Sequence, residues 1–398
     1  MDSLGQRDTI RISLLYSSTG AYAALGREAI DGAMAAIAEV NSDPALPFRF
    51  EPVIADPGGS AERYAALAEE AIMRNQCRHV VGTITSWSRK EVLPIVERSG
   101  ALLWYAFPHE GYEASDHALY LGACPNQHLI PLLDYVFPRF GGRPFVVGSN
   151  YIWGWEIGRI ARELTDAAGG TVLSERYVPL GSVEVEHLIE EIRARKPDFV
   201  LSNLVGSSAA AFLKAYAALG RADSEFLPAR RPVVSCNATE TDLQDLGDAA
   251  EGHITTSIYF DRLDTPENHA FKARLADRFG ARKLSSPFVS AHMAVSILAN
   301  AVAEAGTDDP KAIRQLVTAR RYDTPLGPLS IDPKTHHAAL RSHLGRSNQA
   351  GEFEVIDSSP SPIMADPYLV HAQMQVSLAE PASSERHLPA AKSLKVIQ

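Results

Sequence analysis

The chain is poor in cysteine, with Cys77, Cys124 and Cys236 as its three examples among 398 residues. They are far apart in the sequence, and none has a CxxC partner or a nearby histidine. An odd number of scattered cysteines argues against a disulfide framework and against a zinc site. We therefore expect three reduced, buried thiols and no metal centre.

The sequence also lacks a long uninterrupted hydrophobic run. Its most apolar stretch, residues 288–303, contains Ser290, His292, Ser296 and Asn300, which makes it too polar and too short to span a bilayer. The first eight residues have neither the basic nor the apolar segment of a signal peptide. The chain as written is thus predicted to be cytoplasmic, or periplasmic if a leader has been cleaved.

Common catalytic and nucleotide-binding motifs are missing, because no GxGxxG, P-loop, GxSxG, HExxH or EF-hand string occurs. His109, His336 and His337 could act as bases, but none has a nucleophile partner recognisable in the sequence. We predict no catalytic residue, no enzyme activity and no cofactor. A hydrolase that uses His109 or Glu110 near a cleft is the least favoured alternative.

Positive charge is in deficit, with 38 Lys and Arg against 48 Asp and Glu, for a net charge of −10. Such a chain is repelled by phosphate backbones, so direct nucleic-acid binding is not expected. The composition, 45% hydrophobic and 22% charged, is typical of a globular protein. The length is sufficient for two α/β lobes with a cleft between them.

Apolar strands alternate with amphipathic helices, which is typical of parallel sheets with crossover helices. In the first helix, Ile30, Met34, Ile37 and Val40 form one apolar stripe. Ser60 is positioned to cap a second helix, and a capping box is predicted at residues 88–91, with Pro94 as a kink. Strands are predicted at residues 10–16, 48–55, 79–84, 101–106, 119–123, 145–148, 199–204, 232–236 and 254–259, and later helices at 265–279, 287–305 and 310–320.

Four segments follow directly after predicted strands, where open α/β sheets build ligand clefts. They are residues 17–20, 83–88, 104–110 and 149–155. Ser18 in the first segment could hold a carboxylate or amide oxygen, although an ordinary strand-to-helix turn explains it as well. Tyr151, Trp153 and Trp155 alternate in a predicted loop, where they either cover a ligand or pack onto their own lobe.

Several strings resemble, in order, those of the amide-sensing regulator of aliphatic amidase expression (AmiC type) and of the urea and short-chain-amide binding proteins of ABC transporters. The strings are GTITSWSRKEVLPIVE (82–97), PHEGYE (108–113), PNQ (125–127) and GSNYIW (148–153), with DPGG (56–59) and TPLGP (324–328). The likeness runs from the first strand to residues 366–368. It implies a type I periplasmic-binding-protein fold, with two doubly wound parallel-sheet lobes joined by a three-strand hinge.

The resemblance also implies which segments form each part. Residues 8–123 and 253–324 would form the N-terminal lobe, residues 124–252 and 325–371 the C-terminal lobe, and residues 372–398 a loosely packed tail. The ligand amide would lie between Ser86 and Tyr105 on one side and Tyr151 on the other. Val205 and Asn237 occupy matching loop positions near the second-lobe cleft.

The sequence departs from the small-amide sensors at Ile84, Phe107 and Trp153, where those proteins carry polar or phenolic side chains. These departures remove hydrogen-bonding groups and add apolar wall, so a larger or more apolar amide, or a related acid, suits the pocket better than acetamide. Phe107 could instead point into the core of the first lobe.

The missing leader favours a cytoplasmic amide sensor, a negative regulator in which lobe closure signals to an RNA-binding antiterminator protein. The alternative is the substrate-binding component of an ABC transporter, with a permease as its partner and urea, short-chain amides or branched amino-acid-like solutes as ligands. The sequence leaves the oligomeric state open, a homo-oligomer included.

Overall fold

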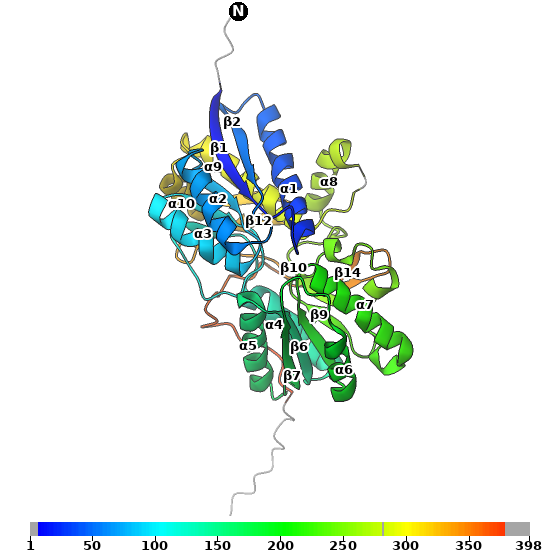
Figure 1. Cartoon of the computed structure of the whole chain (residues 1–398). Helices are drawn as coiled ribbons and strands as arrows, with labels where there is room; N and C mark the ends of the chain where they lie inside the picture. Colours follow the sequence, from blue (N-terminus) through cyan, green and yellow to red (C-terminus); the bar gives the residue numbers. More distant parts are fainter. Residues whose placement is uncertain (1–6, 281, 379–398) are drawn as a thin grey trace, which may run out of the picture.

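The computed structural model describes residues 7–280 and 282–378 and divides them into two lobes, an upper and a lower one in Figure 1. The first lobe is built on a parallel sheet in the order β2 (Phe48–Ala55), β1 (Asp8–Leu15), β3 (His79–Gly82), β4 (Leu102–Tyr105) and β5 (Ala118–Tyr120). Its helices are α1 (Ala23–Ser42), α2 (Ala61–Met73), α3 (Ser86–Ser99), α8 (Pro266–Phe279), α9 (Ser286–Ala305) and α10 (Pro310–Ala319).

The second lobe contains a seven-stranded sheet in the order β14 (Phe353–Ser358), β13 (His343–Ser347), β10 (Ile254–Ser257), β9 (Val233–Ser235), β8 (Phe199–Asn203), β6 (Pro144–Ser149) and β7 (Ser174–Val178). The strands from β10 to β7 are parallel, whereas β13 and β14 add an antiparallel edge. Its helices are α4 (Pro125–Phe140), α5 (Ile152–Ala167), α6 (Glu186–Arg195) and α7 (Ser207–Ala222). The predicted α/β class and two-lobed architecture are confirmed.

The helix α1 packs closely against α9 in the core of the first lobe. Gly32 permits the approach, because a Cβ there would lie 2.0 Å from the carbonyl oxygen of Phe288. Among the described residues, α9 is the one helix that is long and apolar enough to cross a membrane, and 72% of its apolar window is buried. By length and composition α9 therefore meets the criteria for a membrane-spanning helix, which the sequence was not expected to do. Its burial is that of a core helix.

One local prediction is confirmed, and three features of secondary structure differ from the prediction. Ser60 caps α2 as expected, with its Oγ accepting from the amide of Arg63 at 3.4 Å. The capping box of α3, however, is formed by Thr85 and Ser88, and Pro94 lies inside the helix without ending it. Residues 152–155 are the first turn of α5 and not a loop. The edge strand β7 was missed because its residues are largely polar.

The chain crosses between the lobes at three points, two of which differ from the expected positions. The first crossing, between β5 and α4, lies near Ala123 as predicted. The second follows β10, which belongs to the second sheet, so residues 254–257 are in the C-terminal lobe. The third comes after residue 338 and not at Thr324, because β11 (Arg321–Thr324) and β12 (Gly327–Ser330) form a hairpin and His337 still pairs with Tyr120 of β5.

The segment at residues 372–378 is anchored on the second lobe, contrary to the expected loose tail. The carboxylate of Asp134 in α4 accepts the amides of Gln375 and Val376 at 2.9 and 3.1 Å. Met374, Val376 and Leu378 alternate in half-buried positions against the core. The rest of the predicted tail, residues 379–398, lies outside the described residues.

This anchoring predicts that a chain ending at residue 371 is less stable than one ending at residue 378 by roughly 2–4 kcal/mol, because three half-buried apolar side chains are lost. Urea unfolding of the two truncated chains measures the difference. Equal unfolding midpoints and slopes would show that residues 372–378 add nothing to the stability of the lobe.

Candidate ligand-binding site between the lobes

A pocket lies between the lobes and contains about 800 Å³ of space, its open mouth included. Its walls follow the carboxyl ends of β3 and β4 in the first lobe and of β6, β8, β9 and β10 in the second. The start of α9 closes one side, and the first turns of α4 and α5 close another. Each sheet therefore contributes the edge at which open α/β folds place their ligands.

The structure brings together seven of the nine residues predicted for the site. The lining residues among them are Ile84, Ser86, Phe107, Tyr151, Trp153, Val205 and Asn237. Tyr105 lies behind the wall, where its hydroxyl donates to the carbonyl oxygen of Ile84 at 2.9 Å. Ser18 lies outside the pocket, because its Oγ donates to the carboxylate of Asp56 at 2.9 Å. A ligand-binding role for the seven residues stays a prediction.

The walls of the pocket are mostly apolar, and no charged side chain lines it in the part of the chain that the structure describes. Phe107 is 6% exposed and packs against Tyr16, with ring centroids 6.1 Å apart, while it also lines the pocket. Phe107 therefore contacts the core of the first lobe and also forms part of the pocket wall, as the two alternative predictions had it. Pockets of this composition bind ligands with a large apolar body and few polar groups.

The placement of Trp153 follows from the helical geometry of α5. Positions two apart on a helix point in nearly opposite directions, so Trp153 is 3% exposed and faces the pocket, whereas Trp155 is 47% exposed. Trp155 instead donates from Nε1 to the side chain of Asn150 at 2.9 Å. The prediction that these aromatic residues alternate in a loop is therefore wrong, because Trp153 and Trp155 lie in the first turn of α5.

Helices that begin at the pocket include α3 at Ser86, α5 after Tyr151 and α9 at Ser286. The first backbone N–H groups of a helix have no partner within it, and they carry partial positive charge. In α5 and α9 no side chain caps these groups. The amides at the two helix starts therefore favour a ligand group rich in acceptor oxygens, such as a carboxylate or an amide carbonyl.

A buried ion-pair network holds Ser86 from behind. The Oγ of Ser86 donates to Glu110 Oε2, and Glu110 Oε1 accepts from Nη2 of Arg89 at 2.8 Å. Arg89 is fully buried and also donates from Nε to Glu113 at 2.7 Å. Because the single proton of the Ser86 hydroxyl is directed at Glu110, the oxygen can only accept a hydrogen bond from a ligand.

The carboxylate of Glu113 supplies the second negative charge of this network. It accepts from Lys90 at 2.9 Å and from the hydroxyl of Tyr120 at 2.9 Å, in addition to Arg89. Burial alone would raise the pKa of Glu113, but the charges of Arg89 and Lys90 lower it to about 2. The residue thus stays ionised over the whole physiological range.

Sequence reasoning missed His128, Gln127, Thr239, Ser257 and Ser286, which line the pocket as well. The strand-end rule could have found Thr239, which lies after β9, and Ser257, which ends β10. His128 and Gln127 lie in the first turn of α4, beside the first crossing. Gln127 ends the PNQ string of the resemblance, whereas no local signal marks His128.

The residues of the hydrolase alternative lie apart from the pocket. His109 is fully buried, and its Nδ1 accepts from the amide of Gly111, while Glu110 is paired with Arg89. Neither residue lines the pocket, nor do His336 and His337. The three cysteines are free and buried, as predicted, and no metal-binding group of three or more ligands occurs within residues 7–280 and 282–378.

Fold and site together define a two-lobed α/β ligand-binding protein with its pocket at the lobe interface. The family model described as periplasmic binding protein domain matches residues 10–374. The chain belongs to this family, whose relatives are binding proteins.

Comparisons with individual proteins agree with this assignment. The Leu/Ile/Val-binding protein homolog 6 of Brucella melitensis biotype 1 is 23% identical over 354 residues, which cover 86% of this chain and 88% of the relative. A solute-binding protein of an ABC transporter from R. palustris, solved with 4-hydroxybenzoate, has a TM-score of 0.80 at 23% identity and covers 92% of this chain and 100% of that one.

A third match is partial. Limonene hydroxylase of Geobacillus stearothermophilus is 28% identical over 123 residues, which are 31% of this chain and 22% of the hydroxylase. The chain thus matches less than a quarter of that protein's length, and its activity does not transfer.

The ion-pair network predicts a pH dependence of stability. The pKa of Glu113 is lower in the folded state than the ordinary value of 4.5, so its contribution is complete above about pH 4.5 and is lost as the pH falls towards 2. Over that range, the difference in unfolding free energy between the wild type and Glu113→Gln should shrink by roughly 3 kcal/mol. Urea unfolding at pH 2.5 to 6 measures it. A constant difference would mean that Glu113 is not held by Arg89 and Lys90.

Proposed function

We propose that the chain is the substrate-binding component of an ABC transporter and that it carries a small organic acid or amide with an apolar body. The observation that carries this proposal is the uncharged, largely apolar pocket at the lobe interface, at which uncapped helix starts of both lobes meet. The acid or amide group would accept from these backbone amides, and the apolar body would lie against walls such as Phe107 and Ile258.

The same pocket disfavours free amino acids as ligands. An α-ammonium group needs a carboxylate or several oxygen acceptors, since a buried unpaired charge costs several kcal/mol. No aspartate or glutamate lines the pocket in the described part of the chain, and Glu110, behind Ser86, is already paired with Arg89. A relative named for Leu, Ile and Val and a structural neighbour solved with 4-hydroxybenzoate therefore point to different ligands, of which the aromatic acid fits better.

Transport is favoured over the amide-sensor role that the sequence resemblance implied. The compared relatives and structures that cover most of this chain are named as solute-binding or amino-acid-binding proteins. The proposed partner is accordingly a membrane permease and not an antiterminator, and a receptor that feeds a permease works outside the cytoplasm. Neighbouring genes for a permease and an ATPase would support this role, whereas an amidase and an antiterminator would support the sensor.

Ligand chemistry is tested with pairs that differ by the ammonium group alone. We expect 3-phenylpropanoate to bind at least about tenfold more tightly than phenylalanine, because the pocket offers the ammonium no charged partner. Isothermal titration calorimetry on both, and on the pair 4-methylpentanoate and leucine, measures the preference. Tighter binding of the amino acids than of the matching acids would overturn the proposed ligand class. Release of ammonia from amides such as benzamide would overturn the non-catalytic role.

Closure of the lobes depends on a glycine at their contact. Gly206 precedes α7 in the second lobe, with φ 62° and ψ −131°, and a Cβ there would lie 2.0 Å from the carbonyl oxygen of Ala21 in the first lobe. The amide of Ser207 donates to the same oxygen at 3.3 Å. Gly280 has nearly the same backbone angles, φ 60° and ψ −139°, but no atom lies within 4 Å of its added Cβ.

Alanine substitutions at Gly206 and Gly280 separate the effect of lobe closure on binding from the effect of backbone strain. Gly206→Ala should weaken ligand binding by at least about tenfold, since the lobes meet a backbone clash when they close and hinge closure is required to bury the ligand. Gly280→Ala should bind like the wild type. Both variants should lose similar stability in ligand-free melting experiments. Equal affinity of the two variants would count against a closed, ligand-burying state.

A further inference from the structure

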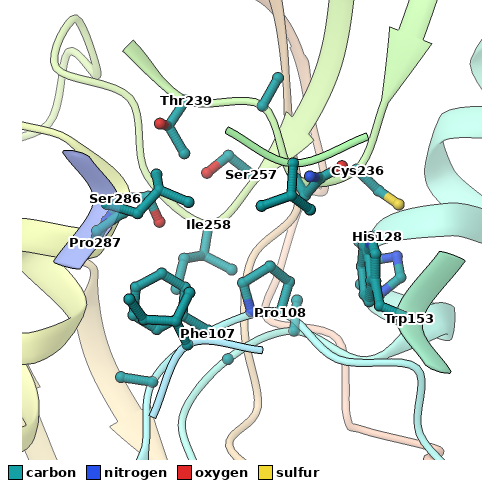
Figure 2. Close-up of a pocket in the computed structure, with 18 of the residues that line it drawn as sticks. Phe107, Pro108, His128, Trp153, Cys236, Thr239, Ser257, Ile258, Ser286 and Pro287 are labelled. Carbon is teal, nitrogen blue, oxygen red and sulfur yellow. The ribbon is translucent and has the colours of Figure 1, made fainter. Parts of the chain in front are cut away.

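Two polar atoms at one end of the pocket have no hydrogen-bond partner. They are Nε1 of Trp153 and Nδ1 of His128, both buried within the described structure. The rings lie side by side in Figure 2, with centroids 5.7 Å apart, and no hydrogen bond joins them. A buried donor or acceptor without a partner is destabilising, so each such atom in a binding pocket requires a physical account.

The tautomer of His128 follows from its other nitrogen. Nε2 lies 3.0 Å from the carbonyl oxygen of His109, and because a carbonyl can only accept, Nε2 carries the proton. Burial lowers the pKa of His128 to about 4, so the ring is neutral and Nδ1 is an acceptor. Trp153 Nε1 is a donor under all conditions. The two neighbouring rings thus present a complementary donor and acceptor at the same end of the pocket.

The backbone fixes both rings on the second lobe. His128 is in the first turn of α4, where its carbonyl oxygen accepts from Oγ1 of Thr256 at 2.9 Å. Trp153 is in the first turn of α5. Both helices belong to the second lobe, whereas the carbonyl of His109 that holds Nε2 of His128 comes from the segment after β4 in the first lobe.

We propose that His128 and Trp153 form a subsite that selects a neutral ligand group able to donate and accept at once, a hydroxyl or a primary amide. Such a group donates to Nδ1 of His128 and accepts from Nε1 of Trp153. A carboxylate has no proton for Nδ1, an ammonium group cannot accept from Nε1, and a methyl group leaves both atoms unpaired. This inference rests on the proposed function. It adds a second polar subsite, which binds a neutral hydroxyl or amide, to the helix starts, which bind the acid or amide group of the ligand.

The subsite predicts selectivity between ligands of equal shape. 4-Hydroxybenzoate and 4-methylbenzoate differ by a hydroxyl against a methyl of similar size, and calorimetry gives the ratio of their dissociation constants. In the wild type the hydroxyl compound should bind at least about tenfold more tightly, as expected where a buried polar pair rejects an analogue that cannot pair with it. Benzoate should bind at an intermediate level or as weakly as the methyl compound.

Two variants assign the selectivity to the two atoms. Trp153→Phe removes the donor and keeps an aromatic ring, and His128→Phe keeps a ring of similar shape but removes the acceptor. Each should reduce the hydroxyl-to-methyl ratio at least about threefold while 4-methylbenzoate binds as before. Trp155→Phe is the matched control, because Trp155 is on the same helix and faces solvent. Melting temperatures verify that each variant is folded.

The outcomes separate the subsite from the proposed function. Binding of both probes with equal affinity in the wild type, or an unchanged ratio in both variants, would overturn the subsite and leave the proposed ligand class standing. Tight binding of amino acids with no binding of either benzoate or of 3-phenylpropanoate would overturn the proposed function, and the subsite with it. A ratio that falls in Trp155→Phe as much as in Trp153→Phe would also overturn the assignment.

Discussion

The cleft depends on one buried guanidinium. Arg89 lies in the first turn of α3 and binds Glu110 and Glu113, which belong to the irregular segment after β4. This pairing ties that segment, and with it Phe107, to the helix start that presents Ser86. Charges out of water are tolerated only when fully paired, so the network can bring four ionisable side chains close to the pocket and still leave its walls neutral. Removal of any one partner would place a net charge behind an apolar cavity.

Much of the fold could be predicted from the sequence because its signals are local. The apolar stripe of α1, the alternation of strands and helices and the Ser60 cap follow from periodicity and from capping preferences. The crossing points could not be located in this way. Residues 254–257 pair with β13, and His337 pairs with Tyr120 of β5, both far away in the chain, and the choice between sheets depends on pairings that no local pattern encodes. β7 was missed for a related reason, since an edge strand needs little apolar character.

The candidate site was predictable to the extent that it follows strands. Ile84, Phe107 and Tyr151 lie in segments that were identified because residues beyond the carboxyl ends of parallel strands meet at one sheet edge. Ser18 obeys the same rule and still lies outside the pocket, because a carboxylate from the neighbouring strand end binds it. His128 was not identified, because it lies inside a helix where nothing distinguishes a histidine that lines a pocket from one that packs in a core. Its role depends on which ring nitrogen donates to the carbonyl of His109, and this contact exists only in the tertiary structure.

The two lobes contribute different chemistry to the pocket, and this division has a consequence for how a ligand would be recognised. Trp153 and His128 belong to the second lobe alone, whereas Ser86 and the start of α9 belong to the first. A ligand that first contacts the second lobe would meet this donor and acceptor pair before the lobes close. The start of α9 in the first lobe would reach its acid or amide group only on closure. Discrimination by shape and hydroxyl pattern would then precede closure, and the free energy of closure would come from the acid group and from the apolar surface that both lobes remove from water.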